Sequence, residues 1–316
     1  MKKKGSIGLD IGTRHINIIK LSATTPGVEL LDVACISSNP RQEKTEKIKE
    51  LKAIVQEKGI ASFPVNIGIC GESVVVRYIT LPKMNTKEIG EALKFEAQQY
   101  IPFKVEEVIF DYYVLGPAET DSNKIRLVLV AAKKETINEL IDLLQQAGLT
   151  PNIIDLNSFA LMNCFQFNNP EVNKESVTAI VNLNLDLLSI NILQGASLYF
   201  TRDVYLSEAT SLIARQQSAE GENLQLVLEN IIREIRLSFD YYESEFEKHI
   251  NTTFFSGEGI RIPSLMDMLK SKLGKEIVSW NPLQKLIINS TQFNTTELQE
   301  KSAVLAIACG LALREI

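Results

Sequence analysis

The sequence has few of the residues from which metal sites, disulfides and membrane anchors are built. Its four cysteines lie far apart, without the close pairs of a zinc site or a redox motif, so we expect buried thiols in a reducing cytosol: Cys35, Cys70, Cys164 and Cys309. The most apolar run, residues 303–313, is too short to cross a bilayer. Any membrane association is therefore expected to be peripheral, with no transmembrane segment.

An excess of charge of one sign is also lacking. The 316 residues include 33 basic and 39 acidic side chains, and apart from three lysines at positions 2–4 the two signs are mixed along the chain. Without a basic stripe to follow a phosphate backbone, nucleic acid is not expected as a partner. Because 45% of the residues are hydrophobic, this length can bury a sizeable core in two domains or one large α/β unit.

Residues 6–19, SIGLDIGTRHINII, predict a β-hairpin with polar residues at its turn. Apolar residues alternate before and after Asp-x-Gly-Thr, which is typical of two strands joined around Gly12 and Thr13. Glycine allows close backbone approach, successive turn N–H groups can hold an anion, and the nearby Asp10 can hold a hydrated Mg²⁺. We interpret the turn as a phosphate-binding hairpin, although Asp-x-Gly is also common in ordinary turns. His15 follows it, either contacting a phosphate or simply exposed or hydrogen-bonded.

A second hairpin repeats this pattern in the other half of the chain. The stretch AIVNLNLDLLSINIL, residues 179–193, aligns with residues 7–21. The alignment pairs Asp10 with Asn182 and Gly12 with Asn184. A short apolar strand at 253–255 later runs into the loop Ser-Gly-Glu-Gly. A duplicated α/β chain with such turns favours a ligand between its halves.

The sequence between the two hairpins predicts a different order of helices and strands. Residues 86–100 carry apolar side chains at helical spacing and are followed by Pro102. Two strands at 108–115 and 124–132 and a helix at 136–147 come next. Helix, strand, strand and helix over about seventy residues indicate a small inserted subdomain.

Taken together, these segments resemble the PilM proteins of type IV pilus assembly, which belong to the actin-like ATPase superfamily. The resemblance covers almost the whole chain and rests on IGLDIGT, LPKMNTKEIGEALKFEAQQYIPFKVEEVIFDYYVLG, LVLVAAKKETINELIDLLQQAGLTPNIIDLNSFAL, FFSGEGIRIPSL and AIACGLALRE. It implies an α/β, actin-like (ribonuclease H-like) fold of two duplicated domains. The implied first domain is 1–80 with 151–172, the inserted α/β subdomain is 81–150, and the second domain is 173–316, with its C-terminal helix packed back on the first.

The resemblance also implies where a nucleotide and a partner bind. The implied nucleotide-binding residues lie in the two hairpins and in the loop at 256–259, which would face adenosine: Asp10, Gly12, Thr13, Arg14, Asn182, Asn184, Gly257, Glu258 and Gly259. The implied cofactors are ATP and Mg²⁺, with Asp10 as the metal ligand. The most family-specific stretch contains Tyr100, Ile101 and Pro102, which would line or shape a groove for a partner peptide.

The implied function is that of a nucleotide-binding scaffold. It would lie in the cytoplasm at the inner face of the inner membrane and bind the cytoplasmic amino-terminal peptide of a PilN-like inner-membrane protein, with other pilus assembly components as further partners. The same superfamily contains sugar kinases, ATPases and polymerising cell-division-type actin homologues, and these remain alternatives.

Three departures from the family pattern bear on catalysis. Asn182-Leu183-Asn184 stands where Asp-x-Gly is usual, Asn157 stands where a glutamate is usual, and Glu258 replaces a glycine. Asparagine can hydrogen-bond a water molecule but cannot act as a general base or add charge around magnesium. We therefore expect no catalytic residue and at most a very weak ATPase, unless Asp155 or Asp186 has taken over the role.

Overall fold

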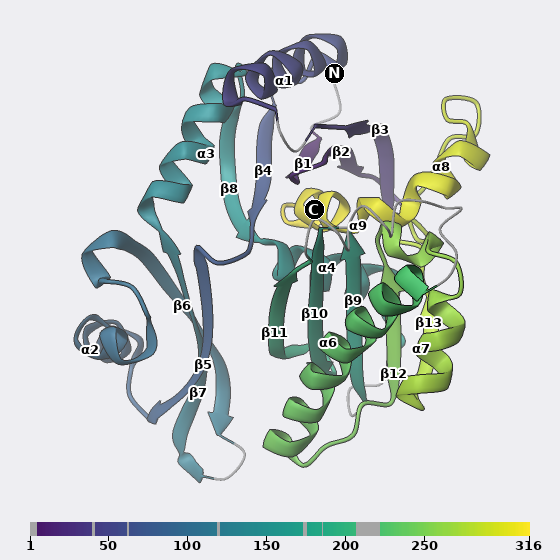
Figure 1. Cartoon of the computed structure of the whole chain (residues 1–316). Coiled ribbons are helices and arrows are strands. Elements are labelled where there is room, and N and C mark those ends of the chain that lie inside the picture. The colour runs from purple at the N-terminus through teal and green to yellow at the C-terminus, as the bar shows by residue number, and fades with distance from the viewer. Residues whose placement is uncertain are drawn as a thin grey trace. The chain divides into compact units, whose positions relative to one another are not determined.

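The computed structural model describes residues 5–39, 42–61, 63–118, 121–172, 176–184, 186–206 and 222–316 (Figure 1). The chain divides into two compact units. The larger unit comprises Met1–Ile69 with Ala147–Ile316, and the smaller unit is Cys70–Gln146. Of the helices that the structure describes, none has the length and apolar character needed to span a membrane.

The first sheet of the larger unit has the strand order β3-β2-β1-β4-β8. Its strands are β1 (Ser6–Ile11), β2 (His15–Ala23), β3 (Val28–Ser37), β4 (Pro64–Ile69) and β8 (Thr150–Leu156). The first three form an antiparallel meander, and β4 and β8 join β1 in parallel. The central strand β1 is buried along almost its whole length, so that Gly8 and Asp10, between its alternating apolar residues, are buried too.

The second sheet repeats this arrangement with the order β11-β10-β9-β12-β13. Its strands are β9 (Val177–Asn184), β10 (Leu187–Gln194), β11 (Ser197–Tyr205), β12 (Thr252–Ser256) and β13 (Glu276–Ser279). Here too an antiparallel meander is extended by two parallel strands. The two predicted hairpins are therefore β1–β2 and β9–β10, at equivalent places in two sheets of one topology, which confirms the duplication.

The α-helices that the structure describes in the larger unit pack around its two sheets. They are α1 (Lys44–Lys58), α4 (Asn157–Asn168), α6 (Glu222–Phe246), α7 (Leu265–Leu273), α8 (Thr295–Lys301) and α9 (Ala306–Leu313). The helix α6 buries Ile231, Ile235 and Phe239 against the second sheet because these residues recur at helical spacing.

The C-terminal helix α9 contacts β1 and α4 (Figure 1). Its backbone comes so close that side chains are excluded at two contact points. A Cβ atom on Gly8 of β1 would lie 1.9 Å from the carbonyl oxygen of Ala308, and one on Gly310 of α9 would lie 1.7 Å from that of Ala160. Glycine at both positions allows the end of the chain to lie against the first sheet, where it reaches the base of the first hairpin.

The smaller unit contains a three-stranded antiparallel sheet of order β5-β7-β6. Its elements are β5 (Val74–Pro82), α2 (Thr86–Tyr100), β6 (Val108–Ala118), β7 (Asp121–Lys133) and α3 (Lys134–Gln146). Although β5 largely precedes residue 81, it pairs with β7 and so belongs to this sheet. A capping box between Asn85 and Glu88 begins α2, and the helix buries Leu93 and its neighbours on the sheet.

Candidate functional site

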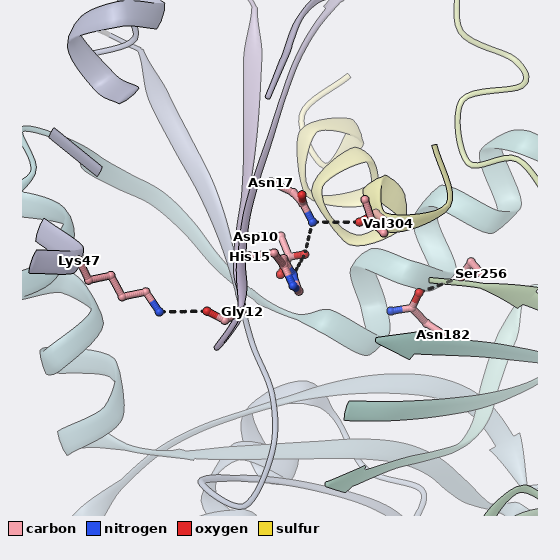
Figure 2. Close-up of polar contacts among 8 residues, drawn as sticks. All are labelled: Asp10, Gly12, His15, Asn17, Lys47, Asn182, Ser256 and Val304. Carbon is pink, nitrogen blue, oxygen red and sulfur yellow. Dashed lines mark hydrogen bonds and ion pairs between the residues drawn. The ribbon is translucent and has the colours of Figure 1, made fainter. Parts of the chain in front are cut away.

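The first hairpin turn is held in place from several sides. The Gly12 N–H donates to the carbonyl oxygen of His15 at 2.9 Å, and the Ser38 N–H donates to that of Arg14 at 2.7 Å. The Lys47 Nζ of α1 donates to the Gly12 carbonyl at 2.9 Å (Figure 2). Within the described part of the chain, the amides of Thr13 and Arg14 have no hydrogen-bond acceptor and the Arg14 guanidinium has no ion-pair partner. The turn thus presents two N–H groups and one cation, which suits an anion.

Asp10 lies at the end of β1 and is only 4% exposed. Its Oδ2 is 3.0 Å from the His15 Nε2 and accepts a hydrogen bond of 3.3 Å from the Asn17 Nδ2 (Figure 2). Asn17 also donates to the carbonyl of Val304, beside the start of α9, at 3.0 Å. The chain end therefore helps to fix the amide that holds the carboxylate.

The imidazole ring of His15 packs directly on the turn. A Cβ atom on Gly12 would lie 2.4 Å from its Cε1 and 2.8 Å from each of its nitrogens. Gly12 does not have a positive φ angle, so the conformational freedom of glycine is not what the turn requires. Glycine is required here because the ring needs the space.

Charges of both signs surround this ring. Burial lowers the pKa of His15, but the carboxylate of Asp10, together with Asp186 and Glu258, raises it overall above its ordinary value. The pKa of Lys47 is lowered, mainly by burial and against the pull of Glu50 and Asp186. Asp186 lies in the second hairpin turn and Glu258 follows β12, so acids in two loops of the second sheet act electrostatically on a ring of the first sheet.

The second hairpin carries its asparagines buried. Asn182 is oriented by Ser256 at the end of the neighbouring strand β12, whose Oγ donates to the Asn182 Oδ1 at 2.9 Å (Figure 2). Asn184 ends β9 and is buried as well. The sequence therefore places neutral amides where the first hairpin has a carboxylate and a glycine.

The loop after β12 rests on the second hairpin. Gly257 has a φ of 91°, and its N–H donates to the carbonyl of Ala303 at 2.8 Å. A Cβ atom on Gly257 would lie 2.4 Å from the Leu183 carbonyl oxygen, and one on Gly259 would lie 2.3 Å from the Leu183 side chain. Both glycines are thus explained by backbone conformation and close packing, while the half-buried Glu258 stands between them.

Two residues where β8 meets α4, Asp155 and Asn157, are ion-paired and neutral respectively. Asp155 ends β8, where its Oδ2 lies 2.9 Å from the Nε of Arg314. Burial raises the pKa of Asp155, against the opposing effect of Arg314. Asn157 begins α4 with a buried Oδ1 that finds no hydrogen-bond partner among the described residues. Neither residue offers a free carboxylate.

The expected partner-binding residues of the smaller unit have different environments. Ile101 is only 2% exposed and belongs to the core between α2 and the sheet, so it can only shape a groove. Tyr100 packs against the same core and is half-buried, whereas Pro102 is exposed. Sequence reasoning missed Phe95, which is 85% exposed on α2. The sequence could have indicated this residue, because a phenylalanine there lies outside the apolar stripe of the helix.

Sequence reasoning also missed Asn17 and Lys47 at the first hairpin. Asn17 lies where an alternating strand pattern allows a polar residue, so the sequence does not indicate its contact with Val304 near the other end of the chain. Lys47 is one of many charges in α1, and only the tertiary structure shows which of them reaches the turn.

Comparison with known proteins gives these features a context. The model of a family described as type IV pilus assembly protein PilM matches residues 8–223 and 213–316. A chain in a solved structure described as a PilM-PilN type IV pilus biogenesis complex is 24% identical, with a TM-score of 0.86 and 98% of each chain covered.

Two further solved structures are more distant. One is a Bacteroides thetaiotaomicron protein with an actin-like ATPase fold and unknown function, at 14% identity and a TM-score of 0.52, with 98% of this chain and 96% of that chain covered. The other is the ethanolamine utilization protein EutJ from Carboxydothermus hydrogenoformans, at 10% identity and a TM-score of 0.54, with 99% and 90% covered. Together these likenesses confirm the predicted fold class, an actin-like ATPase fold of two ribonuclease H-like domains with a small extra sheet.

Proposed function

The chain belongs to the PilM family of type IV pilus assembly proteins, and from this premise we propose that it is a non-enzymatic scaffold of the pilus assembly machinery. It binds a nucleotide between its two hairpins and the amino-terminal peptide of a PilN-like inner-membrane protein through its smaller unit. The observation that carries the proposal is the family match along almost the whole chain. Through such a partner the protein would be held at the cytoplasmic face of the inner membrane.

Exposed apolar side chains on the smaller unit support the peptide site. Among the described residues, ten large hydrophobic side chains are exposed, and four of them lie in this unit: Phe95, Ile109, Tyr113 and Val114. The unit makes up only residues 70–146 of the chain, so this share is high. Exposed apolar surface on a small domain is typical of a surface that a partner covers, and an extended peptide with apolar residues has the matching chemistry.

The peptide site is tested by titrating the full chain with a fluorescent peptide from the amino terminus of a candidate PilN-like protein. Phe95→Ala should weaken binding by about tenfold or more, because truncating an aromatic anchor at an interface commonly costs that much. The ring is exposed, so the variant should keep its fold. Leu226→Ala, which removes a 58% exposed side chain from α6 of the larger unit, is the matched control. If Phe95→Ala and Tyr100→Ala both bind as tightly as the control, α2 is not part of the docking surface.

The first hairpin supports the nucleotide site in part. The amides of Thr13 and Arg14 and the Arg14 guanidinium suit the phosphate groups, and the loop at 256–259 would face adenosine. Asp10 is not a fully open ligand for magnesium in this arrangement, because its Oδ2 already contacts both His15 and Asn17, and only its Oδ1 has no hydrogen bond among the described residues. A bound nucleotide would supply a link between the two sheets.

The residues around this site favour binding over turnover. Asn157 and Asn182 are neutral, and Asp155 is paired with Arg314. A general base must be free to take a proton from the attacking water. Asp186 and Glu258 remain near the hairpins without an ion pair among the described residues, and the role of Asp186 in turnover is checked by the measurements of phosphate release given below.

A further inference from the structure

The carboxylate expected to hold magnesium already has partners supplied by the protein. Asp10 is buried, and its Oδ2 lies 3.0 Å from the His15 Nε2 and 3.3 Å from the Asn17 Nδ2. Asn17 is itself fixed by the Val304 carbonyl, so neither contact depends on a freely moving side chain. Figure 2 shows the His15 and Asp10 side chains pointing toward one another beside the Gly12 turn.

The position of His15 is built into the turn as well. Its ring occupies the space that a side chain at residue 12 would need, with contact distances of 2.4 and 2.8 Å to a Cβ placed there. A glycine at this position thus accommodates the ring in its contact with Asp10. The arrangement links Gly12, His15 and Asp10 into one unit.

Both acidic and basic side chains lie around this site. Asp186 and Glu258 act electrostatically on the same ring, and Lys47 binds the Gly12 carbonyl. Arg14 lies in the turn and has no ion-pair partner in the described ranges. A magnesium-dependent site leaves its carboxylates open, so that the metal ion links them to the phosphate oxygens. Here the chain provides hydrogen-bond donors and cations of its own.

We propose that His15 takes the place of a magnesium ion, so that the first hairpin binds the phosphate groups of a nucleotide without a divalent cation. This inference rests on the proposed nucleotide site and deepens it. Arg14 and the turn amides bind the phosphate oxygens, and His15 keeps Asp10 from repelling them. In this role His15 is a positioning residue that determines which form of the ligand, metal-free or metal-bound, the site accepts.

The first test is calorimetric titration of the full chain with ADP and with ATP, in excess magnesium and in EDTA. The wild-type chain should bind with less than about a threefold difference between the two conditions. His15→Ser frees the Asp10 carboxylate, so magnesium should then strengthen binding by about tenfold or more, as expected for one charge-assisted contact. His15→Gln keeps a donor toward Asp10 and should behave like the wild type. His249→Ser, which changes the chain's other histidine, is the control.

A second readout follows the histidine itself. The chain has two histidines, so a sample labelled at histidine gives two pairs of ring signals in a proton–carbon NMR spectrum, and His249→Ser identifies the pair from His15. Adding ADP in EDTA should shift the His15 signal and leave that of His249 in place. This readout does not depend on any activity.

The outcomes separate this inference from the function on which it rests. If magnesium tightens wild-type binding by more than about threefold, or if the His15 signal moves only when magnesium is present, His15 does not replace the metal, while the nucleotide site stands. A His15→Ser chain that binds as well in EDTA as in magnesium also overturns the inference. If no nucleotide binds to any of these chains in either condition, the inference and the nucleotide site both fail, and the peptide site is untouched.

Discussion

The contact between Gly12 and His15 allows the proposed His15–Asp10 pair to be tested without changing either member. In Gly12→Ala the new methyl group would lie 2.4 Å from the His15 Cε1, which is too close for any real contact. The backbone at residue 12 has no positive φ angle and can accept alanine. The imidazole ring must therefore move, and its contact with the Asp10 Oδ2 is lost.

The expected change in the free energy of unfolding combines the loss of the His15–Asp10 contact with the effect of alanine on the unfolded chain. A hydrogen bond to a charged group contributes about 1.5–3 kcal/mol to stability, and Asp10 is left with one partner fewer in a buried place. Replacing glycine by alanine at a compatible position stabilises by about 0.4–1 kcal/mol through the unfolded state. We expect Gly12→Ala to lower the free energy of unfolding by about 1–2 kcal/mol in the wild-type chain. In a His15→Ser chain, where the ring is absent, the same change should be neutral or slightly stabilising.

Urea denaturation of the four chains of this double-mutant cycle measures the coupling directly. The expected coupling energy between positions 12 and 15 is about 2 kcal/mol, well above the few tenths that independent sites show. A coupling energy below about 0.5 kcal/mol would mean that the ring is not held between Gly12 and Asp10. The reasoning about the first hairpin would then be refuted.

Two further predictions concern pH and turnover. Because the pKa of His15 is raised in the folded chain, its stabilising contribution is fully present below the unfolded pKa of about 6.5 and is lost as pH rises through the folded pKa. The gap in unfolding free energy between wild type and His15→Ser should therefore narrow from pH 5.5 to 9 in urea denaturation, and a constant gap would contradict the assignment. For turnover, the purified chain should release phosphate from ATP near background, since loss of a catalytic group removes about two to four orders of magnitude in rate. Asn182→Asp, which can keep the Ser256 bond, should raise that rate, whereas wild-type release of order one per second that Asp155→Ala or Asp186→Ala abolishes would contradict the proposed non-enzymatic role.

Local patterns predicted much of the fold. The alternation at 7–21 and its echo at 179–193 predicted both hairpins, because a buried strand pair joined by a tight turn is encoded within about fifteen neighbouring residues. The helix at 86–100 was equally well defined, since its apolar spacing agrees with its cap. The sheet to which β5 belongs could not be predicted from local sequence. Its pairing with β7 joins residues about fifty positions apart, and no local pattern distinguishes that sheet from the first one.

The candidate site was less predictable because its contacts are long-range. Asn17 touches Val304 across almost the whole chain, and the need for Gly257 and Gly259 comes from Leu183 on another strand. In the sequence these glycines read as a ligand loop. In the structure they are also required by packing, so their presence alone is weaker evidence for a nucleotide than the sequence suggested.

The departures at the two hairpins have one physical consequence in common. A metal-dependent phosphate site needs carboxylates whose oxygens are open toward the ligand. At the second hairpin that charge is absent, because Asn182 is a neutral amide that Ser256 orients. At the first hairpin the charge is present, but His15 and Asn17 occupy its Oδ2. Under the proposed metal-free binding the two changes act in the same direction by different means, since neither hairpin offers a fully open carboxylate while the turn amides and Arg14 stay in place. This combination suits the proposed scaffold, since a scaffold depends on the bound state lasting and not on its turnover.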